Sequence, residues 1–171
     1  MDIIYILPFP EEICSKIVLY AFKSPHTDLE YGYLKHILGG AEYNRFVENG
    51  GIDKDAGHIT KVSVSSMLVA YHFDIQVLHV LQNLTQFDLG GTCVFGDITV
   101  LPTNLTKLDL YKTNVTGDIS VLPINLTEFD LSNTNVFGDI QVLHGLQHLT
   151  EFTLYGTGVF GDIQVLHGLQ N

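Results

Sequence analysis

The chain has 171 residues, 46% of them hydrophobic, which suits one domain with a packed core plus a small appendage. Its formal net charge at pH 7 is −11, from 8 Lys and Arg against 19 Asp and Glu. This charge disfavours nucleic acid and anionic membrane surfaces as partners, and it favours a protein with a basic or mixed-charge surface.

The start of the chain does not read as a signal peptide. Asp2 stands where a basic stretch belongs, and Glu11 and Glu12 follow soon after. No apolar run approaches the roughly 18 residues of a membrane helix. Cys14 and Cys93 lie too far apart in sequence to suggest a disulfide framework. We therefore expect a cytoplasmic protein, with the nucleus as the alternative compartment.

Residues 1–56 predict a helical N-terminal segment. Pro10 occupies a natural helix start, and Ile13 and Ile17 follow at helical spacing. A second helix is predicted between Thr27 and the Gly39-Gly40 pair.

The first of these helices resembles the opening of an F-box, whose pattern is L-P-x-E-[LI]-x-x-x-I. Here Phe9-Pro10-Glu11-Glu12-Ile13 is followed by Ile17, with Phe9 in place of the leucine. The resemblance implies that Pro10, Ile13 and Ile17 dock the adaptor of a cullin-type ubiquitin ligase. The simpler alternative is that the helices only cap the domain that follows.

The second half of the chain is an internal repeat. Gly-Asp-Ile occurs at 96–98, 117–119, 138–140 and 161–163, and Phe-Asp-Ile at 73–75, in steps of 23, 21, 21 and 23 residues. Such a period indicates a solenoid. Each unit points about six apolar side chains inward, and burying them yields roughly 1.5–3 kcal/mol apiece. Ordering the roughly 21 residues of the unit costs roughly 1–2 kcal/mol per residue, so a lone unit is unstable. Only stacked units give a continuous core.

The repeat pattern L-x-x-L/F-x-L-x-x-T-x-V-x-G-D-I resembles the leucine-rich-repeat family, in the subclass that reads L-x-G-x-I. A weaker copy at 59–69 supplies a first coil. The resemblance implies an α/β solenoid over residues 57–171, with five short parallel strands near 62–64, 87–89, 108–110, 129–131 and 152–154. F-box proteins often carry such repeats just downstream, which is the order found here.

Threonine stands where this family usually has asparagine. The residues are Thr92, Thr113, Thr134 and Thr157. We expect their hydroxyls to donate to backbone carbonyls of the next coil, as a ladder that replaces the usual amide ladder.

One predicted binding surface is the outward face of the strands. Alternate residues of a strand face out, so the repeats align polar side chains in columns across the sheet. The candidate partner-binding residues are Asp88, Lys107, Asp109, Tyr111, Glu128, Asp130, Ser132, Glu151 and Tyr155. Tyrosines framed by acids suit a basic protein surface, and leucine-rich repeats usually bind through this face. The alternative is a solvated face without a partner.

A second predicted surface depends on residues 94–98 and their copies being extended. Phe95, Phe137 and Phe160 would then point outward in a column that also includes Thr116, beside the column that begins at Asp97. Exposed aromatic residues in a row indicate an interaction site. Alternatively, each phenylalanine folds over the loop of the neighbouring coil.

The sequence predicts neither a metal site nor a cofactor nor catalysis. A straight carboxylate column does not converge six oxygens on one point, and His79, His144 and His167 lack a further ligand in the pattern. Gly156, Gly158 and Gly161 spell GxGxxG, but Gly161 is the repeat glycine, and too few residues follow for a dinucleotide-binding unit.

Three functions are therefore open from the sequence. The main hypothesis is a non-catalytic protein–protein interaction module that uses the acidic strand face. The second is an F-box-type substrate receptor. The third is a structural or oligomeric element joined through a C-terminal coil that lacks a polar cap.

Overall fold

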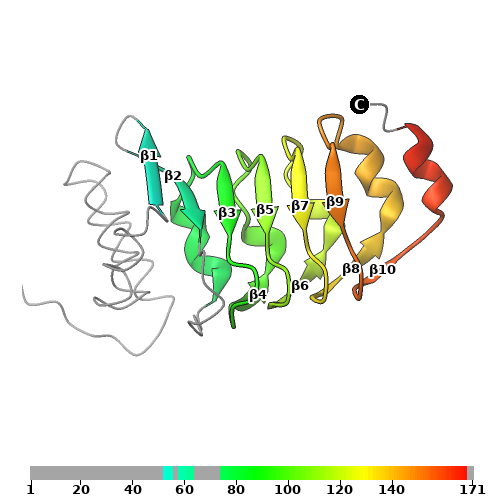
Figure 1. The fold of residues 1–171 in the computed structure, drawn as a ribbon, viewed down its shortest axis with the longest axis horizontal. Coiled ribbons are helices and arrows are strands. Elements are labelled where there is room, and N and C mark those ends of the chain that lie inside the picture. The colour runs from blue at the N-terminus through cyan, green and yellow to red at the C-terminus, as the bar shows by residue number, and fades with distance from the viewer. Residues whose placement is uncertain (1–51, 56–57, 64–73, 169–171) are drawn as a thin grey trace, which may run out of the picture.

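The computed structural model describes residues 52–55, 58–63 and 74–168, which form a stack of coils (Figure 1). The stack is the predicted leucine-rich-repeat solenoid. Most of the helical segment predicted for residues 1–56 lies outside the described residues, as do Pro10, Ile13 and Ile17.

The larger sheet contains one strand from each of five coils and one additional strand, β1. Its strands are β1 (Ile52–Asp55), β2 (His58–Ser63), β3 (Gln86–Asp88), β5 (Lys107–Asp109), β7 (Glu128–Asp130) and β9 (Glu151–Thr153), in the order β1-β2-β3-β5-β7-β9. From β2 to β9 all pairs are parallel, which confirms the five predicted parallel strands. Strand β1 was not predicted and pairs antiparallel with β2. The division of the chain at residues 56 and 57 stays a prediction.

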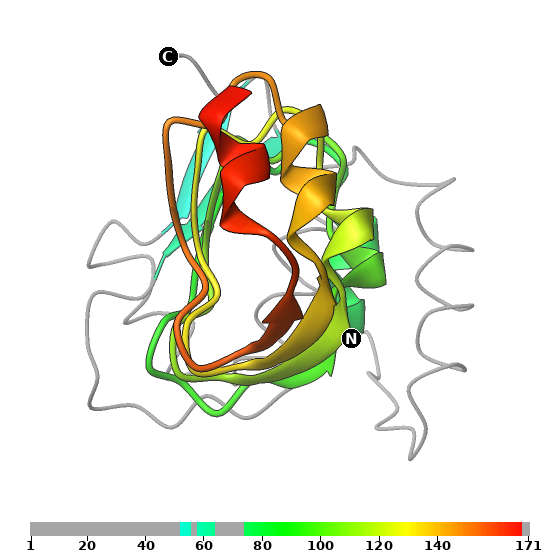
Figure 2. The same cartoon turned by 90° about the vertical axis from the view of Figure 1, so that its right-hand side faces the viewer.

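A second sheet lies on another side of the coils. It is parallel and contains β4 (Phe95–Asp97), β6 (Asn114–Asp118), β8 (Asn135–Asp139) and β10 (Gly158–Phe160). A short 3-10 helix follows each of these strands: η2 (Ile98–Val100), η3 (Ile119–Val121), η4 (Ile140–Gly145) and η5 (Ile163–Gly168). A further one, η1 (Ile75–Val80), follows Asp74, which forms an isolated bridge with Phe95 of β4. Figure 2, viewed along the stack, shows the two sheets and the helices enclosing the interior.

Stacking is what buries the core. Leu89, Leu110 and Leu131 hold the same position in successive coils, and each is 0% exposed. In the last described coil, Phe152 and Leu154 are only partly buried, although their equivalents one coil earlier are buried. The core of one coil is therefore completed by the coils on either side of it.

The repeated Gly-Asp pair joins neighbouring coils. The Asp97 carboxylate accepts a hydrogen bond from the Thr99 N–H (2.9 Å) and so caps η2. Gly117, in the next coil, has φ +125, and a Cβ there would lie 2.7 Å from Asp97 Oδ1. Asp97, which begins the column predicted beside the phenylalanines, is half-buried, because its carboxylate caps a helix and lies against the glycine of the next coil.

The prediction that threonine hydroxyls donate across coils is wrong for Thr92, Thr113, Thr134 and Thr157. Each hydroxyl donates to a carbonyl of its own coil, three residues earlier, as Thr113 Oγ1 does to Leu110 O (2.7 Å). At this position of the repeat the nearest acceptor is the carbonyl of the residue three earlier, so each hydroxyl closes its local turn and does not bond to the next coil.

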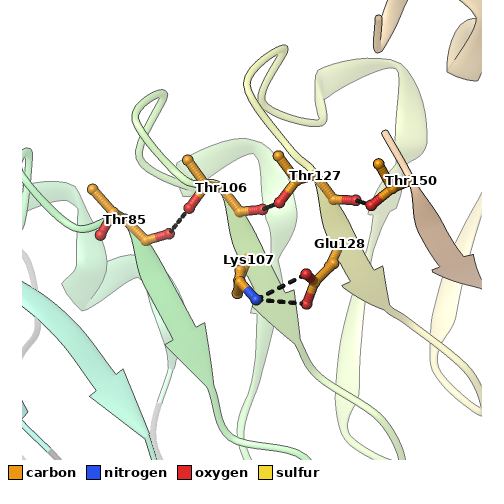
Figure 3. A network of polar contacts seen from close by, with 6 residues as sticks. All are labelled: Thr85, Thr106, Lys107, Thr127, Glu128 and Thr150. Carbon is orange, nitrogen blue, oxygen red and sulfur yellow. Dashed lines mark hydrogen bonds and ion pairs between the residues drawn. The ribbon is translucent and has the colours of Figure 1, made fainter. Parts of the chain in front are cut away.

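A different column of threonines links the coils (Figure 3). The hydroxyls of Thr85, Thr106, Thr127 and Thr150 each donate to the carbonyl of the threonine one coil earlier, beginning at Thr60, over 2.9–3.0 Å. The backbone N–H groups of the same threonines donate to the same carbonyls. This ladder fixes the axial register of the larger sheet.

We predict that Gly117→Ala destabilises the fold by about 1–3 kcal/mol, because its φ suits glycine alone and the new Cβ would meet Asp97 and Ile98. The matched control is Gly145→Ala, where a Cβ would meet nothing within 4 Å, and its effect should stay within about 0.5 kcal/mol. Urea denaturation measures both variants. Equal stability of the two would contradict the role given to the Gly-Asp contact.

Candidate functional site

The strand face carries a groove of about 460 Å³ that extends over the parallel strands from β2 to β9. Its polar lining consists of Lys61, Ser63, Gln86, Asp88, Lys107, Asp109, Glu128, Asp130, Glu151 and Thr153. Six of the nine residues predicted for partner binding are among them. Five carboxylates face two lysines in this lining, so the groove is acidic.

Sheet register places the aspartates next to one another. Asp88 on β3 is paired with Asp109 on β5, and Asp109 with Asp130 on β7. On β9 the corresponding residue is Thr153, so the aspartate ladder ends at β7. Parallel strands lie about 4.8 Å apart, which brings like charges close together.

Backbone turns hold these carboxylates in position. Tyr111 N–H donates to Asp109 Oδ1 (2.9 Å), and Ser132 N–H donates to Asp130 Oδ1 (2.8 Å). Asp88 is held at both oxygens, since Gly90 N–H donates to its Oδ1 (3.3 Å) and Ser63 Oγ to its Oδ2 (3.0 Å). Asp109 and Asp130 therefore each keep one oxygen, Oδ2, that receives no hydrogen bond from the described residues.

The central aspartate, Asp109, has a shifted pKa. Burial raises the pKa of Asp109, and the charges of Asp88 and Asp130 add to the rise, while the Tyr111 N–H opposes it. Gly90 contributes to the tight packing, because a Cβ there would lie 2.6 Å from Asp109 Oδ1.

One ion pair crosses the face between β5 and β7. Lys107 Nζ lies 2.8 Å from both carboxylate oxygens of Glu128 (Figure 3). Both side chains are nearly half exposed, so the pair contributes at most about 1 kcal/mol. Asp109, Asp130 and Glu151 have no cationic partner within the described part of the chain.

Three of the nine residues predicted for partner binding lie beyond the groove lining, namely Tyr111, Ser132 and Tyr155. Tyr155 is 77% exposed, and Tyr111 is half-buried beneath Lys112, whose Nζ is 5.1 Å from the ring centroid. Ser132 differs from the expectation of an outward position. It is only 3% exposed, and its hydroxyl donates to Asp130 Oδ1 (2.5 Å), so it supports that carboxylate and does not face a partner.

The second predicted surface is broken up by the register of its sheet. Phe137 and Phe160 are 48% and 64% exposed, whereas Phe95 is half-buried. Phe137 is paired with Asp118 on β6 and with Gly158 on β10, while Phe160 is paired with Asp139. Each residue of this sheet is paired with the one that lies two positions before its repeat equivalent in the next coil. The phenylalanines therefore do not form the straight column that the sequence predicts.

Among residues 52–55, 58–63 and 74–168, no group of three or more His, Cys, Asp or Glu side chains is placed to hold a metal ion. His79, His144 and His167 are exposed on η1, η4 and η5. No helix in the same part is long and apolar enough to cross a membrane.

Comparison by sequence finds no match among protein-family models and none among curated proteins. Comparison by structure finds leucine-rich-repeat proteins. The leucine-rich-repeat ectodomain of the receptor kinase SOBIR1 from Arabidopsis thaliana has a TM-score of 0.57 at 18% identity, covering 80% of this chain and 97% of that one. Internalin C2 from Listeria monocytogenes has a TM-score of 0.52 at 26% identity, covering 66% and 49%.

A third similar structure is the plant peptide hormone receptor RGFR1 in complex with RGF2. It has a TM-score of 0.53 at 21% identity and covers 71% of this chain. The present chain spans only 20% of the length of that receptor chain. Together with the repeat geometry, these similarities define the fold as a short leucine-rich-repeat solenoid.

We predict that Asp109→Asn stabilises the fold by about 1 kcal/mol at pH 7, because it removes two like-charge contacts. The folded pKa of Asp109 is raised, so its ionised form costs stability above that pKa and the cost disappears as the carboxyl becomes protonated at lower pH. The stability advantage of the variant should therefore shrink as pH falls toward 3.8, the ordinary pKa of an aspartate.

Urea denaturation at neutral and acidic pH measures this difference. Asp118→Asn is the control, because Asp118 caps η3 through Ser120 N–H and asparagine caps equally well. A variant at position 109 that is less stable than the parent at pH 7 would show that the ladder is not repulsive.

Proposed function

We propose that the chain is a non-catalytic protein-interaction module whose strand face binds a partner with a basic surface. The main observation behind this proposal is the acidic groove over the parallel strands, whose lining contains five carboxylates and two lysines. One of those lysines, Lys107, is already paired with Glu128.

The arrangement of the carboxylates supports a cationic ligand. Asp109 and Asp130 are fixed by backbone N–H groups at one oxygen each, and no residue of the described part of the chain donates to their other oxygens, which can accept from an external donor. Fixed acceptors bind with little loss of conformational entropy. A basic partner would also relieve the repulsion along the ladder, and long-range attraction would raise its association rate.

The fold is compatible with this role. RGFR1, which shares the fold, is a peptide hormone receptor solved with RGF2 bound. At 21% identity that likeness concerns the fold alone, so the chemistry of the ligand is argued here from the groove of this chain.

The test is selection of binders from a library of random peptides displayed on phage. We expect the selected peptides to be enriched in Arg and Lys, and to bind at least about tenfold more weakly to the triple variant Asp109→Asn, Glu128→Gln, Asp130→Asn. Affinity for the parent should fall as salt is raised, because exposed charges are screened.

The control must change the net charge equally away from the groove. Thr99→Lys, Ser120→Lys and Gln141→Lys together add three positive charges at exposed positions on η2, η3 and η4. This variant should bind the selected peptides within about twofold of the parent. Peptides without cationic enrichment, or equal losses in both triple variants, would refute the proposal.

Two alternative functions still rest on the sequence alone, as does the expected cytoplasmic location. An F-box-type receptor would be retained by the ubiquitin-ligase adaptor, and the double variant Ile13→Asp, Ile17→Asp would not. A structural or oligomeric element would change its mass on dilution, as measured by light scattering, whereas a monomer at all concentrations excludes that role.

A further inference from the structure

The two tyrosines of the strand face differ in whether a cation of the chain itself lies over the ring. Tyr111 and Tyr155 occupy the same repeat position, each two residues beyond its strand. Lys112 follows Tyr111 in the left-handed region (φ 53°) and places its Nζ 5.1 Å from the ring centroid. The chain itself therefore supplies a cation to the face of Tyr111.

Tyr155 has no such cover. The next residue is Gly156, also at positive φ (70°), and a Cβ there would lie 2.7 Å from Asn133 Oδ1. The Tyr155 ring is 77% exposed and has no cation over it among the described residues. It stands where Tyr111 stands, but the position taken by the ammonium group of Lys112 is unfilled by this part of the chain.

The surroundings of Tyr155 suit a cation. Glu151 and Thr153, on the strand that leads to Tyr155, line the end of the groove, and Asp130 is the register partner of Thr153. The charge of the groove is also graded along the stack, because its lysines lie on β2 and β5, whereas its glutamates lie on β7 and β9. Positive groups of a ligand are therefore drawn toward the β9 end.

We propose that Tyr155 is the stacking site for an arginine side chain of a basic peptide segment bound in the groove. This inference rests on the proposed function, and it specifies that the cation is received at the β9 end of the groove. Arginine is preferred over lysine because its planar guanidinium stacks on an aromatic face and keeps its N–H donors at the edge of the plane, where they remain able to hydrogen-bond.

In the experiment, the full chain is titrated with a short peptide of alternating glycine and arginine, and separately with its lysine analogue. Binding is measured from the shifts of the amide signals in NMR spectra. The parent should bind the arginine peptide more tightly. Tyr155→Leu should weaken that binding by about three- to tenfold and remove most of the preference for arginine. Tyr155→Phe keeps an aromatic face and should stay within about twofold of the parent.

Tyr111→Leu is the matched control, because Lys112 already covers that ring. It should leave the affinity within about twofold. Denaturation curves of both leucine variants show that each remains folded at the temperature of the titration. A variant Tyr155→Leu that binds both peptides as the parent does would overturn the inference.

The remaining outcomes separate the two proposals. If the triple variant at Asp109, Glu128 and Asp130 loses binding while Tyr155→Leu does not, the acidic groove stands and the stacking site at Tyr155 is refuted. If the parent binds neither peptide, both proposals are refuted together.

Discussion

Everything on the strand face depends on the stacking of one coil upon the next. A single coil cannot bury its own apolar residues, so neighbouring coils must lie in contact, and the threonine ladder and the Gly-Asp pairs fix how they align. Once that alignment is fixed, residues at one repeat position are brought side by side whatever their charge. The packing of the core therefore determines which polar groups meet on the surface.

This constraint explains why like charges meet on the acidic face and repel one another. Asp109 lies between Asp88 and Asp130 because the core requires that register, and its raised pKa reflects both the burial and the two neighbouring charges. A carboxylate with a raised pKa marks a candidate functional site. Under the proposed function, a cationic partner would relieve part of the repulsion along the ladder on binding.

The sequence predicts those features that depend on the repeat period, and fails where two positions in the repeat carry the same residue type. Asp88, Asp109 and Asp130 could be aligned from the period alone. Two positions of the repeat are threonine in every unit, and the period cannot tell that one closes a local turn while the other links the coils. Ser132 was placed outward by alternation, but its bond to Asp130 turns it inward. Strand β1 and the two-residue offset of the second sheet involve backbone geometry that no residue pattern encodes.

A solenoid of this kind separates its folding residues from its recognition residues. The residue after the tyrosine position is Gly91, Lys112, Asn133 or Gly156 in successive coils, and all four have positive φ. Because the backbone there is set by the turn, the side chain is free to vary among residues that tolerate this conformation. Lys112 covers one tyrosine, and Gly156 leaves the other open. One variable position therefore determines which aromatic surface is available to a ligand, without any change in the core.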